Sequence, residues 1–300
     1  MDRKIYRELN GPKMTEKQIE QYLERIETDK NADADLEYLT KLQSANVNHI
    51  PYENLDILAG REISLDREHL FEKIILNKRG GVCSEINTLY NWLLESLGYD
   101  TVSYNSRIIA RANPVQTTGH RVIGVNIDGV SYITDVGVNY EHHRIPLQLA
   151  DGLVQNDGVC DYKLEKDDFF GWVLWQQRPG TEWRKKLGFT ENPNIDLDYI
   201  QALYMAIHHE GSKFNKTAKV SQYIDGEFFA VREREFFAEH EGIPESLCTF
   251  ENKEDESRKI REAGKEAGKR TGYRSDLPPG GGQIKVHHGH EGCHQPERQK

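Results

Sequence analysis

The chain has 300 residues and a formal net charge of −10, with 39 Lys and Arg against 49 Asp and Glu. This acidic balance argues against general nucleic-acid binding, which needs a basic face to neutralise phosphates. No segment approaches the roughly 18 apolar residues of a membrane span, and the N-terminus lacks the apolar core of a signal peptide. We therefore expect no nucleic-acid or membrane partner and a cytoplasmic location.

Residues 1–99 are predicted to form a helical domain, because apolar residues recur along this stretch at helical spacing. A basic turn followed by Gly80 and Gly81 ends one helix. The next helix begins close to Cys83 and ends at Gly98. Its apolar stripe consists of Ile86, Leu89, Tyr90, Leu93, Leu94 and Leu97.

Residues 100–195 contain short β-branched, partly alternating segments, which are typical of strands. Asp128-Gly129, between two such segments, is a strong signal for a two-residue hairpin turn. We therefore expect a small antiparallel sheet or barrel in this part of the chain, and an α+β fold for the whole.

Residues 196–250 begin with a predicted helix over 196–209, followed by a second hairpin around Asp225-Gly226. The stripe expected for this helix is Leu197, Ile200, Leu203 and Ile207. Residues 251–300 are charged and poor in large apolar side chains, so we expect a flexible tail. Its histidine-rich end, residues 287–294, is interpreted as a polar terminus rather than a metal site.

The four cysteines are widely spaced and form no Cys-x-x-Cys pair, which excludes a zinc ribbon and argues against a disulfide framework. One of them, Cys83, follows two glycines and falls in the first turn of a predicted helix. There the unpaired N–H groups and the helix dipole favour a thiolate, the nucleophilic form of the side chain. Cys83 is therefore a candidate nucleophile, and the alternative is a half-buried structural cysteine.

A thiol nucleophile needs a base, and the first predicted hairpin offers one. If Asp128-Gly129 is its turn, the register places Asp135 opposite Val122 and His120 opposite Gly137. His120 and Asp135 then share one face as diagonal neighbours, within reach of an imidazole–carboxylate hydrogen bond. Gly137 is expected to leave room for the imidazole ring.

Several segments resemble those of the arylamine N-acetyltransferases. Residues 22–26 are similar to the Tyr-x-x-Arg-Ile opening of that family, and residues 50–55 to its Ile-Pro-Phe-Glu-Asn-Leu segment. Residues 79–87 match its Arg-Gly-Gly-x-Cys-x-Glu-x-Asn signature. His120 and the Asp-x-Gly at residues 135–137 also fall where the family has them, and the resemblance covers about residues 20–245.

The resemblance implies three parts: a helical domain over 1–99, an antiparallel β-barrel domain over 100–195 and an α/β lid over 196–250, with a tail over 251–300. It also implies a ping-pong reaction without a metal or a tightly bound cofactor. Cys83 would take an acetyl group from acetyl-CoA, with His120 as its base and Asp135 orienting His120. The acetyl group would then pass to an arylamine, an arylhydrazine or an N-hydroxyarylamine, and the oligomeric state is not implied.

By the same resemblance, residues along the CoA channel would be Thr118, Gly119, Ser212 and Phe214. Val138 would line the acceptor pocket, at a position where the family usually has Phe. Ser84 stands where the family usually has a larger residue, and fewer strands than usual are expected after Tyr223. The resemblance therefore fixes neither the shape of the acceptor pocket nor the identity of the acyl donor. An amide synthase, or an acyltransferase with another acyl-CoA donor, is an alternative.

A third hypothesis is a catalytically silent protein that binds aromatic amines, for which the alkylation of Cys83 should show an ordinary thiol near a pKa of about 8.5. Two neighbouring features are interpreted as structural. Arg79 and Glu85 are expected to fix the turn and helix around Cys83 through charge pairs. His142 and His143 are expected to form an exposed loop pair.

Overall fold

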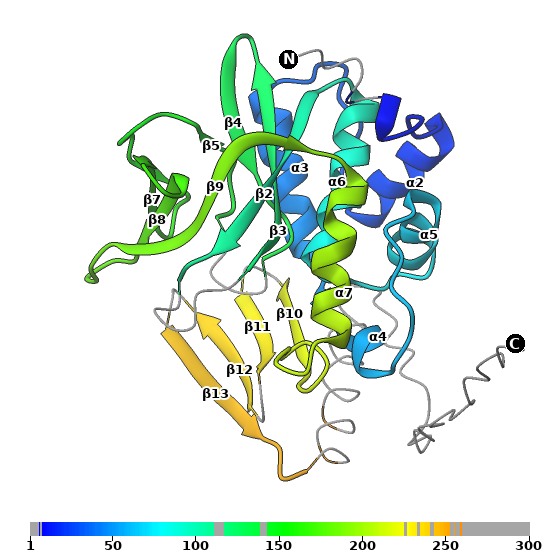
Figure 1. Cartoon of the computed structure of the whole chain (residues 1–300), viewed down its shortest axis with the longest axis vertical. Helices are drawn as coiled ribbons and strands as arrows, with labels where there is room; N and C mark the ends of the chain where they lie inside the picture. Colours follow the sequence, from blue (N-terminus) through cyan, green and yellow to red (C-terminus); the bar gives the residue numbers. More distant parts are fainter. Residues whose placement is uncertain are drawn as a thin grey trace, which may run out of the picture.

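The computed structural model describes residues 6, 8–110, 117–138, 143–224, 227–232, 235–240, 243–252, 255 and 259. Helices come first along the chain, then an eight-stranded antiparallel sheet, then a helix and a five-stranded sheet (Figure 1). This arrangement confirms the predicted α+β class with its helical first part and its antiparallel barrel-like sheet. Among the described residues, no helix is both long and apolar enough to cross a membrane.

The helices of the first part begin and end at recognisable capping residues. Thr15 and Gln18 form a capping box at the start of α2, and the side chain of Asp35 accepts from Tyr38 N at the start of α3. Gly98 ends α6 in the left-handed conformation. The bounds are α2 (Glu16–Arg25), α3 (Leu36–His49), α4 (Leu55–Leu58), α5 (Arg67–Phe71), a π-helical turn (Glu72–Leu76) and α6 (Cys83–Leu97).

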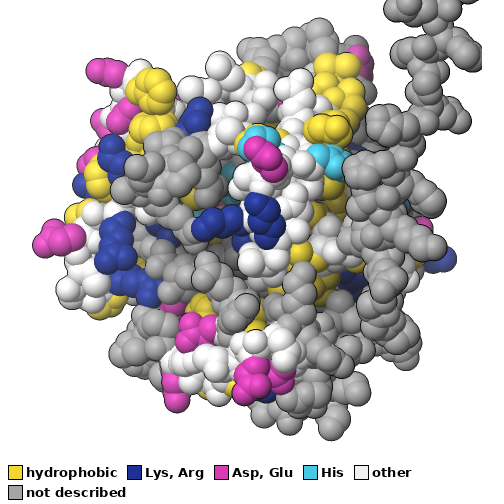
Figure 2. Space-filling view, turned by 60° about the horizontal axis from the view of Figure 1, so that its bottom comes forward, with side chains coloured by type: hydrophobic (Ala, Val, Ile, Leu, Met, Phe, Trp, Pro, Cys, Tyr) yellow, Lys and Arg dark blue, Asp and Glu magenta, His cyan; other side chains and the backbone are white. Residues whose placement is uncertain are grey.

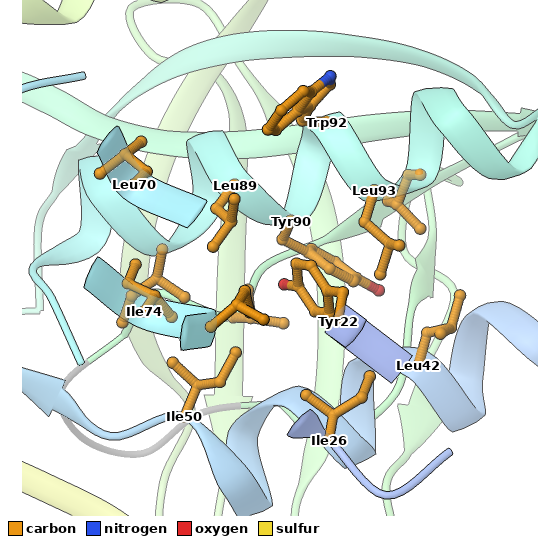
Figure 3. Packing of buried hydrophobic residues seen from close by; sticks show 14 of the residues in the cluster. Tyr22, Ile26, Leu42, Ile50, Leu70, Ile74, Leu89, Tyr90, Trp92 and Leu93 are labelled. Carbon is orange, nitrogen blue, oxygen red and sulfur yellow. The ribbon is translucent and has the colours of Figure 1, made fainter. Parts of the chain in front are cut away.

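The main hydrophobic core lies between α6 and the helices that precede it. Leu89, Tyr90 and Leu93 of α6 point towards the layer that holds Tyr22 and Ile26 (Figure 3). All five side chains are buried, and burying a large apolar side chain contributes about 1.5–3 kcal/mol. This packing holds α6, and with it the first residue of that helix, in a fixed position.

The eight-stranded sheet has the order β5-β4-β3-β2-β9-β8-β7-β6, and all its neighbours are antiparallel. It has a buried core of its own, in which the rings of Tyr104 and Phe189 stack on each other with centroids 5.7 Å apart. The bounds are β2 (Asp100–Ile108), β3 (Thr118–Ile127), β4 (Val130–Thr134), β5 (Leu147–Gln148), β6 (Gln155–Asn156), β7 (Asp161–Asp167), β8 (Gly171–Gln177) and β9 (Arg184–Asn194).

The five-stranded sheet has the order β1-β10-β11-β12-β13, so β1 from the helical part pairs with the last part of the chain. The predicted second hairpin is confirmed, because β10 and β11 pair from Ile224 and Glu227 outward. Two more strands, β12 and β13, follow that hairpin in the sheet. The bounds are β1 (Tyr52–Glu53), β10 (Lys219–Ile224), β11 (Glu227–Arg232), β12 (Glu235–His240) and β13 (Ile243–Thr249).

The helix predicted over 196–209 is a 3-10 turn, Asp196–Tyr199, followed by α7, Ile200–His208. Its expected stripe is wrong at Leu197 and Ile200, which are 66% and 48% exposed. A 3-10 turn has 3.0 residues per turn instead of 3.6, so it rotates the start of the segment relative to α7. The buried face is instead formed by Tyr199 and Leu203.

A buried charge cluster joins all three parts of the fold. Asp196 Oδ1 lies 2.8 Å from Arg121 Nη2 of β3, and Asp196 Oδ2 accepts from Arg67 Nε of α5 at 2.8 Å. Arg121 also donates to Thr88 Oγ1 of α6 at 2.7 Å and to Ser103 Oγ of β2 at 2.8 Å. The start of the third part is thus tied to the strand that carries His120 and to the helix that begins at Cys83.

The predicted tail over 251–300 lies outside the described residues, apart from positions 251, 252, 255 and 259. The histidine-rich segment at 287–294 is among the residues that are not described.

Candidate active site

Cys83 is the first residue of α6 and is half-buried. The turn before it lies against β1, since Glu53 N donates to Gly81 O at 2.9 Å and Gly81 N donates to Pro51 O at 3.3 Å. A Cβ atom on Gly80 would lie 2.0 Å from Pro51 O, so only glycine fits there. The chain is thereby turned so that the thiol stands at the N-terminus of α6.

A buried network of charges lies beneath this turn. Lys73 Nζ donates to Glu85 Oε1 at 2.7 Å and lies 2.8 Å from Asp56 Oδ2. Arg79 Nη2 donates to Glu53 Oε1 at 2.7 Å. Burial raises the pKa of Glu85 above its ordinary value, and the opposing effect of Lys73 is smaller. Arg79 and Glu85 thus form the charge pairs that were expected around this turn.

The β3–β4 hairpin has the predicted two-residue turn. Ile127 pairs with Val130, and Asp128 and Gly129 have φ values of +50° and +81°, as a type I′ turn requires. The resulting register brings His120 and Asp135 together: His120 Nε2 lies 2.6 Å from Asp135 Oδ2. Asp135 is fully buried and His120 is 7% exposed, so the diagonal pair predicted from the turn is confirmed.

The hairpin meets the start of α6, which the sequence did not show. The meeting point is Gly137, where an added Cβ atom would lie 2.8 Å from Cys83 Cα and 2.7 Å from Asn87 Nδ2. The expectation that Gly137 makes room for the ring of His120 is therefore wrong. The β3–β4 ladder ends at Thr134, and the chain beyond it turns towards α6. Gly137 makes room for the helix instead.

The surroundings of His120 favour its protonated form. Burial lowers the pKa of the imidazole, but the charge and hydrogen bond of Asp135, together with a hydrogen bond to Cys83, raise it from 6.5 to about 10. Because Nε2 faces Asp135, the ring nitrogen that remains for Cys83 is Nδ1. The thiol of Cys83, the imidazole of His120 and the carboxylate of Asp135 are thus linked in that order.

The raised pKa of His120 predicts a pH dependence of folding stability. Below pH 6.5 both the folded and the unfolded chain hold the proton, so the ion pair contributes fully; above it, the contribution falls until the folded chain loses the proton at about pH 10. We expect the Tm difference between the wild type and His120→Gln to shrink as the pH rises through this window. Differential scanning calorimetry measures it, and a difference that grows with pH would contradict the assignment.

The residues expected along the donor channel gather around α7. Thr118 is exposed at the start of β3, and an added Cβ on Gly119 would lie 2.5 Å from Ala202 Cβ of α7. Ser212 follows α7 and donates to Ala206 O at 2.6 Å, which satisfies a carbonyl at the helix end. Phe214 is half-buried against the same core that Cys83 borders.

Four further residues that the sequence singled out near Cys83 and Asp135 are Ser84, Val138, His142 and His143. Ser84 is buried and Val138 is half-buried, and residues 139–142, with His142, lie outside the described residues. The expected exposed pair is wrong for His143, which is 3% exposed. Gln43 of α3 donates to His143 O at 2.7 Å, so a buried helix residue holds this histidine inside.

Sequence reasoning gave no role to Asn87, although the structure places it among these side chains. Asn87 lies one turn after Cys83 on α6, is fully buried, and donates to Asp135 Oδ1 at 2.8 Å. Its spacing of four residues from Cys83 was the available signal, because residues i and i+4 share one face of a helix. The described residues contain no cluster of His, Cys, Asp and Glu that could hold a metal ion.

Comparisons with known proteins show the family to which the chain belongs. A family model described as N-acetyltransferase matches residues 35–263. The arylamine N-acetyltransferase of Mycolicibacterium smegmatis is 31% identical over 234 residues, which are 75% of this chain and 84% of that protein. That of Escherichia coli is 30% identical over 199 residues, 65% of this chain and 69% of that protein.

The fold is also similar to solved structures. The Mycobacterium marinum arylamine N-acetyltransferase in complex with CoA has a TM-score of 0.75 and 27% identity, and the match covers 85% of this chain and 92% of that one. The M. smegmatis enzyme has a TM-score of 0.75 and 29% identity, with 85% and 91% covered. The chain therefore belongs to the arylamine N-acetyltransferase family and is an acetyltransferase.

Proposed function

We propose that this enzyme transfers an acetyl group from acetyl-CoA through a thioester on Cys83 to the nitrogen of arylamines and arylhydrazines, or to the oxygen of N-hydroxyarylamines. The observation that carries the proposal is the alignment of Cys83, at a helix N-terminus, with the buried pair of His120 and Asp135, 2.6 Å apart. A thiol, a base and a group that orients the base are the set that nucleophilic acyl transfer requires.

In the first half-reaction, the Cys83 thiolate attacks the carbonyl carbon of the thioester. Backbone N–H groups at the start of α6 stabilise the oxyanion that forms. The C–S bond to CoA then breaks, the CoA thiolate leaves with the proton held by His120, and the acetyl group stays on Cys83. His120 is then neutral and ready to act as a base.

In the second half-reaction, the acceptor nitrogen attacks the acetyl-cysteine. His120 removes a proton from the nitrogen, the bond between carbon and the Cys83 sulfur breaks, and the amide leaves with the free thiolate restored. Asp135 stabilises the imidazolium at both stages without taking its proton. No metal or bound cofactor takes part in these steps.

Three observations support CoA as the carrier of the acyl group. The family includes the M. marinum enzyme, whose structure is a complex with CoA. The segment after α7 carries Lys213, Lys216 and Lys219, and basic side chains also gather near the centre of the face in Figure 2. Local positive charge attracts an anionic ligand even to an acidic protein. We place Thr118, Gly119, Ser212 and Phe214 along the donor channel.

The first test uses the donor alone. Acetyl-CoA without an amine should leave one acetyl group on the chain, visible by intact-mass spectrometry, because the acyl-enzyme accumulates when no acceptor is present. Cys83→Ser should lose the adduct, whereas the matched control Cys248→Ser, at another half-buried free cysteine, should keep it. An adduct retained in full by Cys83→Ser would overturn the assignment.

A second candidate is an amide synthase or an acyltransferase that uses a bulkier acyl-CoA. It is favoured by Ser84 and Val138, which are smaller than the residues that the family usually has at these positions. A panel of acyl-CoA donors with one fixed arylamine distinguishes the two. A silent binding protein is indicated instead if the wild type binds an arylamine but forms no adduct with any donor.

We place the reaction in the cytoplasm, where free thiols such as those of Cys83 and Cys160 persist.

A further inference from the structure

The side-chain amide of Asn87 makes three hydrogen bonds, all of them to the hairpin segment that carries His120 and Asp135. Its Nδ2 donates to Asp135 Oδ1 and to Arg121 O, both at 2.8 Å. Its Oδ1 accepts from Val136 N at 2.9 Å. The side chain is fully buried, so these bonds are shielded from water and are costly to leave unmade.

The three bonds of Asn87 go to Asp135 itself and to the residues that directly follow His120 and Asp135. Arg121 follows His120 directly on β3, and Val136 follows Asp135 directly beyond β4. Asn87 itself lies four residues after Cys83, on the same face of α6. One amide group therefore connects the helix that presents the thiol to the strand that carries His120 and to the segment after β4 that carries Asp135.

We infer that Asn87 is a positioning residue for the proposed acyl transfer: its amide sets the distance and orientation of the His120–Asp135 pair relative to Cys83. This inference rests on the proposed function. Asn87 touches neither the donor nor the acceptor, because it has no exposed surface. It acts through Asp135, whose Oδ1 it shares with Gly137 N, a donor at 2.9 Å.

Two donors on Oδ1 have a definite consequence for Asp135. They stabilise the ionised carboxylate and hold its plane, so that Oδ2 remains directed at His120 Nε2. Without the amide, Asp135 keeps one of these donors and loses its link to α6. The hairpin is then free to shift relative to the thiol, and a misplacement of about 1 Å can cost roughly 10²-fold in rate.

The test compares Asn87→Ala with Asn91→Ala. Asn91 is the matched control, because it is also fully buried on α6, one turn further on, and donates to Glu95 Oε1 at 2.8 Å instead of to the hairpin. We expect Asn87→Ala to lower kcat by about 10²-fold with little change in KM. Asn91→Ala should lower the Tm but keep kcat within about threefold of the wild type.

A second readout needs neither donor nor acceptor. The rate at which iodoacetamide alkylates Cys83, followed by peptide mass spectrometry across the pH range, reports the thiolate that His120 supports. Asn87→Ala should slow this reaction at neutral pH by about tenfold and change the shape of its pH profile. Asn91→Ala should leave the profile of the wild type unchanged.

Equal alkylation profiles for the two alanine variants, or a wild-type profile in Asn87→Ala, would overturn the inference. If Asn87→Ala does not fold, Asn87→Ser takes its place, since a hydroxyl fills part of the site but is too short to bridge α6 and Asp135. If the wild type forms no acetyl adduct, the proposed function fails, and the alkylation profiles still decide whether Asn87 positions the pair.

Discussion

Replacing Asp135 with asparagine should lower kcat/KM for acetyl transfer by roughly 10⁴-fold while the chain stays folded. Both carboxylate oxygens accept hydrogen bonds: Oδ2 from His120 Nε2 at 2.6 Å, and Oδ1 from Asn87 Nδ2 at 2.8 Å and Gly137 N at 2.9 Å. An asparagine can accept on one side only. Its oxygen keeps the two donors, and its amino group is left facing the imidazole.

The imidazole must then present a bare Nε2 to that amino group, so its proton moves to Nδ1. This tautomer places a proton on the nitrogen that faces Cys83, and the ring can no longer take the proton of the thiol. Initial rates with acetyl-CoA and a simple arylamine measure the loss. Asp168→Asn, at an exposed carboxylate of the β7–β8 turn, is the control and should behave as the wild type. A loss smaller than about tenfold in Asp135→Asn would remove Asp135 from the mechanism.

The second large effect concerns stability. Asp196→Ala should lower the free energy of unfolding by about 3–5 kcal/mol, because it removes the carboxylate that pairs with Arg121 and one of the two that pair with Arg67, which keeps Glu95 at 3.0 Å. Burial on its own raises the pKa of Asp196, but Arg121 and Arg67 outweigh it and hold the pKa below its usual value. The carboxylate is therefore ionised in the folded chain, and its removal breaks two charge pairs at once.

Urea unfolding followed by circular dichroism measures this change in stability. Asp198→Ala is the matched control, since Asp198 lies in the same 3-10 turn and is exposed. Its side chain accepts one hydrogen bond among the described residues, from the backbone N–H of Ile195 at 2.8 Å. We expect it to cost about 1 kcal/mol. Equal losses in the two variants would show that Arg121 and Arg67 gain nothing specific from Asp196.

The features that could be predicted from the sequence are those set by local rules. The Asp128-Gly129 turn fixes the register of its two strands, and from that register the approach of His120 to Asp135 follows without any knowledge of the rest of the fold. A glycine pair before an amphipathic stripe likewise locates the helix start at Cys83.

The features that were missed depend on segments far apart in the chain. Strand β9 lies between β2 and β8, yet its residues Arg184–Asn194 lack a regular apolar alternation, because the pairing is fixed by its neighbours rather than by its own pattern. The role of Gly137 depends on where α6 lies, and the phase of α7 depends on the 3-10 turn before it. No local pattern contains this information.

The two-residue turn of the first hairpin also limits how this protein can change over evolutionary time. Side chains alternate along a strand, so one inserted or deleted residue between His120 and Asp135 turns one of them to the opposite face of the sheet. A change in length dismantles the pair even if every original side chain is retained. The number of residues between His120 and Asp135 is thus as much a part of the active site as the residues themselves.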